Sequence, residues 1–192
     1  ISTKASNFSS TIVKEEDYTG VKFTGLNGST DIMVSNVLDG SVKYPFGSDK
    51  FFKFKHYLSA VKIYAKAENS SQDIGIWGEI SNVIIMGQTT SCDISLPETA
   101  GIDSFGEVKK WGTENAKLPI TTTPIFGPND SGNQNNIEAE EYPISLDGGN
   151  TEKYLGYSLI KPLVKDSDEV LRIQIHTSAG VYEVNVNENF EA

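Results

Sequence analysis

The chain has few side chains that can act as nucleophiles, general bases or soft metal ligands: one cysteine, Cys92, and two histidines, His56 and His176. A thiol nucleophile needs a histidine beside it, and a structural zinc site needs several thiolates or imidazoles. A single cysteine excludes an internal disulfide and a thiolate zinc cluster. Because Cys92 alternates with Ile94 and Leu96, we expect it to be a small buried hydrophobic residue.

The two histidines occupy different sequence environments. His56 falls on the apolar side of its run, beside Phe54, and we expect it to pack in the core with one hydrogen bond. His176 lies on the outward side of its run with Arg172 and Gln174, which predicts exposure to solvent. The chain contains no HExxH, GxSxG or phosphate-binding loop pattern. The sequence therefore offers no recognisable catalytic centre, and we expect a protein that is not an enzyme.

Acidic residues gather in short runs, which we interpret as solvated loops. A glycosidase needs two carboxyl groups held across a sugar at a defined separation, which adjacent acids in turns rarely supply. Oxygen ligands for calcium are also present, but neither candidate group matches an EF-hand, and we expect no cofactor or metal. The acidic runs are Glu15-Glu16-Asp17, Glu138 with Glu140-Glu141, and Asp166 with Asp168-Glu169; the calcium candidates are Asp166, Asp168 and Glu169, or Asp147 with Asn150.

Aromatic residues give the chain one candidate binding chemistry. Trp77 and Trp111, with Tyr44, Tyr142 and Tyr157, can form a platform on which a sugar ring stacks. Scattered aromatic residues in a β-sandwich also serve as core or rim packing. Trp77 and Trp111 are therefore candidate glycan-stacking residues, with packing as the alternative.

Charge and composition restrict the partners. The 192 residues carry a formal net charge of −10, and Arg172 is the only arginine. Nucleic-acid binding needs clustered basic residues, and an anionic membrane surface repels an acidic protein. The chain contains no window of about 18 apolar residues that would span a bilayer. We interpret the negative charge as favouring solubility in an extracellular or periplasmic setting.

Alternating side chains predict strands along most of the chain. Phe52, Phe54, His56 and Leu58 share one face, whereas the apolar set then moves to Val61, Ile63 and Ala65. This change of parity predicts a bulge near Ser59-Ala60. A helix over residues 56–65 is the alternative, because Leu58, Val61 and Ala65 also fit a helical stripe.

The last two runs are the clearest strands. Leu171, Ile173 and Ile175 alternate with polar residues, and Tyr182, Val184 and Val186 do so after a short turn that contains Gly180. Frequent short strands without a long amphipathic helix predict an all-β, mostly antiparallel sandwich of the transthyretin-like or immunoglobulin-like kind. We expect a flexible N-terminal arm over residues 1–20, with regular structure starting near Val21, and one sandwich domain over residues 21–192.

Several segments resemble, in their order, motifs of the fimbrillin-like surface proteins of Bacteroidota. The signature is an apolar strand with Phe-x-His, then Leu-(Ser/Ala)-x-(Val/Leu)-x-(Ile/Val), which residues 52–63 match. The resemblance continues in residues 31–35, 80–87, 157–162 and the hairpin over 171–186. It implies transthyretin-like sandwiches, export to the cell surface as a lipoprotein, and a fimbrial subunit or adhesin, with exchange of a β-strand between subunits in some members.

The function that follows is cell-surface adhesion or a fimbrial structural role, through β-strand addition to an exposed sheet edge. The candidate edge is the last strand, with Tyr182, Val184 and Val186. Expected partners are other fimbrial subunits or surface receptors, at the outer membrane or in a fimbrium. The alternative is a glycan-binding sandwich that uses Trp77 or Trp111, and a third hypothesis, an acid hydrolase, requires two carboxylates in one cleft.

Overall fold

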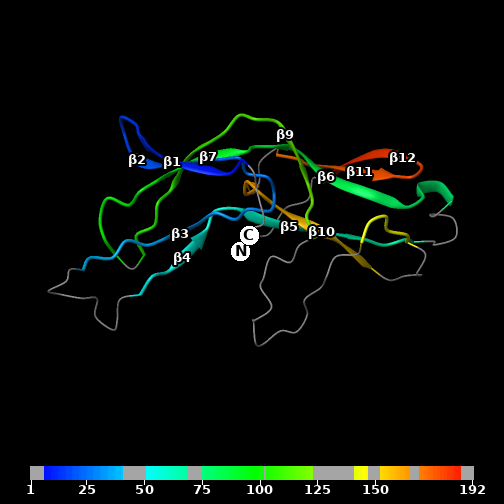
Figure 1. The fold of residues 1–192 in the computed structure, drawn as a ribbon, viewed down its shortest axis with the longest axis horizontal. Helices are drawn as coiled ribbons and strands as arrows, with labels where there is room; N and C mark the ends of the chain where they lie inside the picture. Colours follow the sequence, from blue (N-terminus) through cyan, green and yellow to red (C-terminus); the bar gives the residue numbers. More distant parts are fainter. Residues whose placement is uncertain are drawn as a thin grey trace.

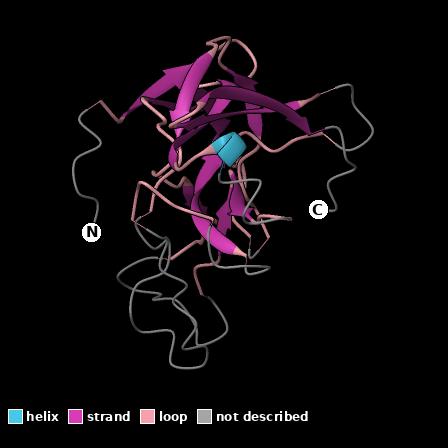
Figure 2. Ribbon diagram, turned by 90° about the vertical axis from the view of Figure 1, so that its right-hand side faces the viewer, coloured by secondary structure: helices cyan, strands magenta, loops and turns pink. Residues whose placement is uncertain are grey.

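The computed structural model describes residues 7–40, 51–68, 75–101, 103–122, 141–146, 152–164 and 169–186. Their regular structure is strand, apart from one short helical segment that includes residues 75–77 (Figure 2). Every strand pair is antiparallel. The predicted all-β antiparallel sandwich is confirmed. Within the described residues, no helix has the length and apolar character needed to cross a membrane.

The strands form two lobes, each with its own core. In the first lobe, a four-stranded sheet of order β1-β2-β7-β8 is accompanied by the pair β3-β4. The bounds are β1 Ser9–Lys14, β2 Thr19–Thr24, β7 Ser91–Ser95, β8 Val108–Trp111, β3 Met33–Ser35 and β4 Phe54–His56. The apolar side chains that these strands and their loops bury together are Leu26, Ile32, Tyr57, Cys92 and Ile94.

The second lobe repeats this plan with a larger core. A four-stranded sheet of order β12-β11-β6-β9 lies over the pair β10-β5 (Figure 1). The bounds are β12 Gly180–Val186, β11 Leu171–Thr177, β6 Ile80–Gln88, β9 Ala116–Pro119, β10 Lys153–Ile160 and β5 Ser59–Ala65. Its buried residues are Ile80, Val83, Ile85, Leu118, Ile120, Ile144, Leu155, Ile160 and Leu171.

Among the described strands, the chain passes from one lobe to the other three times, each time between two consecutive strands. β6 is followed by β7 after Thr89-Thr90, β8 by β9 after residues 112–115, and β4 by β5 after Tyr57-Leu58. We call the region of residues 87–90 and 112–115 the waist. Because the same chain segments enter both cores, neither lobe is built from one continuous stretch of sequence.

The side chains that face the core change parity at the waist. In β6, Val83 and Ile85 are fully buried, whereas in β7 the residues of the core cluster are Cys92 and Ile94. The register between β6 and β9 shifts between Ile85 and Gln88. Gly87 lies inside this shift with a φ of 73°, a left-handed conformation that favours glycine. Such a local irregularity exchanges the alternate side chains that point inward.

The expected N-terminal arm is wrong for the part of it that the structure describes. β1 begins at Ser9 and pairs with β2 from Ser9↔Thr24 to Lys14↔Thr19. The alternation of Ile12 with polar neighbours is weak because β1 is an edge strand with little buried surface. Residues 1–6 lie outside the described residues.

The predicted inward face of residues 52–58 is wrong for Phe52, Phe54 and His56, whereas Leu58 packs against the first core. Phe54 is 63% exposed and His56 is exposed, whereas Tyr57 is only 6% exposed. The Tyr57 hydroxyl donates a hydrogen bond to the carbonyl oxygen of Gly106, which supplies the polar partner that a buried tyrosine needs. Alternation fixes which residues share a face, and it leaves open which face turns inward.

The continuation of this segment follows the prediction more closely. Val61, Ile63 and Ala65 pack against the second core from β5, so the helix proposed as an alternative for residues 56–65 is wrong. In place of the bulge expected near Ser59-Ala60, the structure has a gap between two strands at Tyr57-Leu58. There the chain leaves the pair β3-β4 and begins to pair with β10.

The corrected face can be tested by a matched pair of substitutions. We expect Tyr57→Ala to lower the free energy of unfolding by about 3–5 kcal/mol, because a buried aromatic ring is removed. Phe54→Ala should change it by no more than about 0.5 kcal/mol, because the ring is exposed. Urea unfolding followed by circular dichroism measures both values. A larger loss for Phe54→Ala than for Tyr57→Ala would contradict the structure.

Candidate functional site

β12 is the outermost strand of its sheet, as the sequence led us to expect. It forms a hairpin with β11 from Leu171↔Val186 to Thr177↔Gly180, with the turn at Ser178-Ala179. At seven residues it is longer than β1, β8 and β9, which are the other outer strands of the two four-stranded sheets in the described residues. A long outer strand offers a row of backbone donors and acceptors to another chain.

The hydrogen-bonding pattern shows which residues of β12 offer these groups. Ile120 N–H donates to the carbonyl of Val83, so Val83 is directed towards the β9 side of β6. In an antiparallel ladder, successive residues point their backbone groups to opposite sides. Ile84 and its partner Gln174 therefore bond to each other, and β11 uses Ile173 and Ile175 to bond β12.

The same alternation carries over to β12 itself. Val184 and Tyr182 pair with Ile173 and Ile175, so their backbone groups are used within the hairpin. The backbone groups of Val181, Glu183 and Asn185 point away from β11, towards the free edge.

The side chains of β12 present an apolar row that is only partly covered. Tyr182, Val184 and Val186 lie opposite Ile175, Ile173 and Leu171, on the face that packs on the core. Val186 packs against that core, but Val184 is 43% exposed. The reason is the width of the layers: the described strands place the pair β10-β5 against a sheet of four strands.

Trp77 lies at the turn end of this strand. Its ring contacts Tyr182 edge to face, with centroids 4.4 Å apart and an interplanar angle of 68°. Trp77, Ile76 and Val181 are all exposed. The structure thus brings together Trp77 and Tyr182, which the sequence assigned to two different functions, and it gives Trp77 a packing partner on the candidate edge.

The other outer strands are less suited to pairing. β9 has only four residues and contains Lys117 and Pro119. β8 also has four residues, contains two lysines and is irregular where it pairs with β7. β1 is longer, with Ile12 exposed, but Ser and Thr make up half of it. Lysine, proline, short length and irregularity all discourage strand addition.

Trp111, the second candidate tryptophan, has a different position. It packs against the first core from the end of β8 and also lines a pocket of about 320 Å³ at the waist. The pocket also contains Arg172, Lys161 and Glu114, which the sequence did not single out as binding residues. The one available signal was that Arg172 is the only arginine of the chain.

Of the remaining aromatic candidates, Tyr142 and Tyr157 are described, and they do not form a platform with these tryptophans. Tyr157 is buried, and the Tyr142 hydroxyl donates to the Leu155 carbonyl at 3.1 Å. Burial raises the pKa of Tyr142 to about 12. Tyr44 lies outside the described residues.

The two histidines lie in different lobes, and the Cys92 thiol is buried in the first core. The expectation of a core position for His56 is wrong, since its Nδ1 lies 2.5 Å from Asp31 Oδ2 at an exposed site. His176 is half-buried rather than exposed, with Nε2 at 3.0 Å from Gln174 Oε1. His56 belongs to β4 of the first lobe and His176 to β11 of the second.

The acidic candidates are only partly described. Glu169 pairs with Lys161 at 2.5 Å, and Glu141 is exposed. Among the described residues, no three His, Cys, Asp or Glu side chains are arranged to hold a metal ion. The acidic and calcium candidates outside the described residues are Glu138, Glu140, Asp147, Asn150, Asp166 and Asp168.

Comparisons of the chain with protein-family models, with curated proteins and with solved structures gave no match.

Cys92 is buried in the first core, as expected, and this predicts its reactivity. Burial, with a smaller contribution from the negative charge of Asp93, raises the pKa of the thiol to about 12. Because the thiolate is the reactive form, we expect Cys92 of the folded protein to resist a disulfide reagent such as DTNB at pH 8. The same reagent should modify it at once in denaturing urea. Rapid labelling of the native protein would contradict this placement.

Proposed function

We propose that this protein is a non-enzymatic adhesion or fimbrial structural subunit that assembles or binds through β-strand addition at β12. The observation that carries the proposal is the free edge of β12, where three residues direct backbone groups outward beside an incompletely covered apolar row. An incoming strand pairs with Val181, Glu183 and Asn185. Its alternate side chains extend the inner face next to Val184.

The energetics of the edge favour an added strand over a separate globular contact. Each main-chain hydrogen bond contributes modestly, about 0.5–1.5 kcal/mol, but the bonds form as a regular ladder. Burial of Val184 and of the exposed part of Trp77 adds an apolar contribution, which scales with the area removed from water. The ladder supplies affinity, and the spacing of the apolar side chains supplies selectivity.

The cellular setting of the proposal rests on the sequence. The segments over residues 31–35, 52–63, 80–87 and 157–162 resemble those of fimbrillin-like surface proteins, and the charge of −10 suits an exported protein. The partners we propose are other subunits of a fimbrium or receptors on a cell surface, with the protein located at the outer membrane.

Proline at position 183 provides a direct test. Proline removes the outward N–H of Glu183, and an edge strand tolerates it there because that N–H is not used within the sheet. We expect the unmodified protein to form concentration-dependent oligomers, seen by sedimentation velocity and electron microscopy, and Glu183→Pro to remain monomeric.

Two matched variants separate the edge from other effects. Glu183→Ala removes the carboxylate but keeps the N–H, so assembly should continue. Ile12→Pro modifies the exposed edge strand β1 and should also leave assembly unchanged. If the unmodified protein is monomeric at every concentration, or if Glu183→Pro assembles normally, assembly by strand addition at β12 is refuted.

Hydrogen exchange gives a second measurement on the same edge. We expect the amide protons of Val181, Glu183 and Asn185 to exchange quickly in the monomer and to become protected on assembly, because only then do they find acceptors. The amide protons of Tyr182 and Val184 should be protected in both states. Equal exchange of all five amides before and after assembly would place the contact elsewhere.

A further inference from the structure

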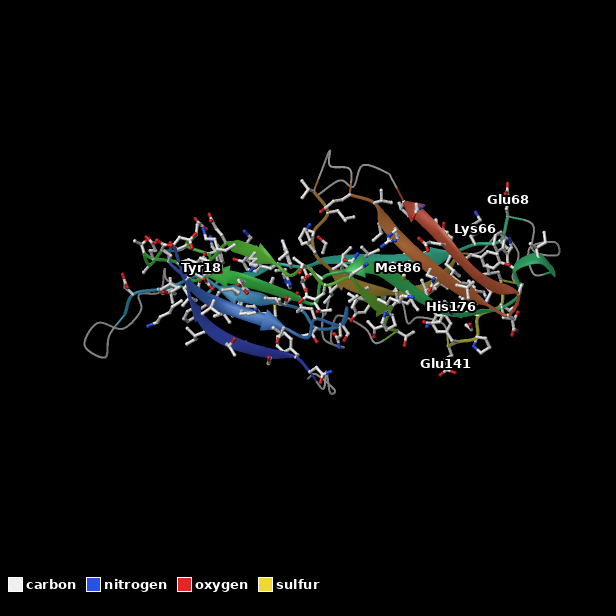
Figure 3. The ribbon with its side chains drawn as sticks, turned by 90° about the horizontal axis from the view of Figure 1, so that it is seen from above. Tyr18, Lys66, Glu68, Met86, Glu141 and His176 are labelled. Atoms are coloured by element: carbon white, nitrogen blue, oxygen red, sulfur yellow. The ribbon has the colours of Figure 1, made fainter. Side chains whose placement is uncertain are left out.

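The waist pocket is formed where the strands of both lobes change course. Its wall includes Trp111 from the end of β8, Met86 from the end of β6 and Arg172 from the start of β11. In Figure 3, Met86 lies between Tyr18 on one side and His176 on the other, away from both ends of the molecule. A volume of about 320 Å³ is at the small end of ligand sites. The pocket therefore suits one small ring rather than a long chain.

Two glycines keep this pocket open. A Cβ on Gly87 would crowd the guanidinium of Arg172, so this side chain lies over the bare backbone of residue 87. A Cβ on Gly112 would collide with the carboxylate of Glu114 and the hydroxyl of Ser91. Glycine at positions 87 and 112 thus leaves room at the waist for the guanidinium of Arg172 and the carboxylate of Glu114, which larger residues at these positions would displace.

The carboxylates of the pocket are held in place by the protein. Glu114 accepts hydrogen bonds from Ser91 Oγ at 2.7 Å and from Thr89 Oγ1 at 3.0 Å, and the bond from Ser91 is the main cause that lowers its pKa. Lys161 donates a hydrogen bond to Glu169, which lowers the pKa of Glu169. The positive charge of Lys161 and the negative charge of Glu169 balance each other. Both carboxylates are therefore ionised at neutral pH and accept hydrogen bonds from hydroxyl groups.

The described lining of the pocket contains two cationic side chains, Lys161 and Arg172. Lys161 lies 2.5 Å from a carboxylate oxygen, whereas no carboxylate that the structure describes is that close to Arg172. Its nearest carboxylate among the described residues is Glu183, with Nη1 and Oε1 4.0 Å apart, which is too long for a hydrogen bond. Within the described part of the chain, its guanidinium makes no hydrogen bond. A planar guanidinium in this state is suited to a carboxylate, which it binds through two parallel hydrogen bonds.

We infer that the waist pocket binds a carboxylated sugar. Arg172 holds the carboxylate, Trp111 lies against the C–H face of the ring, and Glu114 accepts a hydrogen bond from a ring hydroxyl. An inorganic anion would meet Glu114 and Glu169 without gaining from the aromatic wall. A neutral sugar would leave the guanidinium of Arg172 without its carboxylate. This inference does not rest on the β12 edge.

Nuclear magnetic resonance titration tests the ligand class. Sodium glucuronate is added to the whole chain labelled with ¹⁵N, and the side-chain N–H signals of Trp111 and Arg172 are followed. We expect saturable shifts of both signals, with glucose and acetate binding at least about tenfold more weakly, because each lacks one half of the recognised chemistry. Added salt should weaken glucuronate binding. If the methyl glycoside of glucuronate binds as tightly as glucuronate itself, the ligand is the end of a glycan. If glucuronate binds more tightly, the ligand is a soluble sugar acid.

Substitutions then test the residues. Arg172→Gln should lower the affinity for glucuronate by roughly tenfold or more, and Arg172→Lys should recover only part of it, because lysine keeps the charge without the paired donors. Glu183→Gln is the matched control, since it removes the carboxylate 4.0 Å from Arg172 and should not lower the affinity, because a competing negative charge is lost. The backbone signals of Val83 and Ile85 report whether each variant keeps its fold.

Three results would overturn the inference: no shifts at Trp111 and Arg172, glucose binding as tightly as glucuronate, or unchanged affinity in a folded Arg172→Gln or Arg172→Lys. Failure here leaves strand addition untouched, because Glu183→Pro tests that proposal separately. Loss of assembly in Glu183→Pro with glucuronate binding intact would show that the two sites are independent.

Discussion

The burial of alternate side chains of one segment, residues 80–95, is the interaction on which both lobes depend. β6 supplies Val83 and Ile85 to one core, and β7 supplies Cys92 and Ile94 to the other. Burying them removes apolar surface from water in two places at once. Because one segment serves both cores, a one-residue change in its register would turn the side chains of this segment to the wrong face in at least one lobe.

The two layers of each lobe differ in width, and this difference decides which part of the wider sheet is left exposed. A sheet of four strands needs a cover of similar width, and the described strands place two-stranded pairs against it. The outer strand β12 is covered less than the central β6: Val184 is 43% exposed, whereas Val83 and Ile85 are fully buried. β12 thus combines a regular backbone with partly exposed valine, whereas β9 and β8 are short and carry lysine or proline. Partial cover and a regular backbone together make one edge suited to a partner.

The waist shows how a break in regular structure creates a site. The register shift near Gly87 changes which side chains point inward, and Gly87 and Gly112 leave room for Arg172 and Glu114. The polar groups there are spread over four separate parts of the chain, from Met86 to Arg172. No spacing in the sequence relates them, so motif reading could not have found this pocket.

Local periodicity was enough to predict many of the strands, the terminal hairpin from Leu171 to Val186 and the burial of Cys92, because each depends on neighbours a few residues apart; it missed β1. The face that turns inward was decided elsewhere. Phe54 looked as apolar as any core residue, yet Tyr57 is the buried one, and its hydroxyl donates a hydrogen bond to the carbonyl of Gly106, far along the chain. Layer width and the waist pocket likewise depend on which distant strands meet, and only tertiary packing determines that.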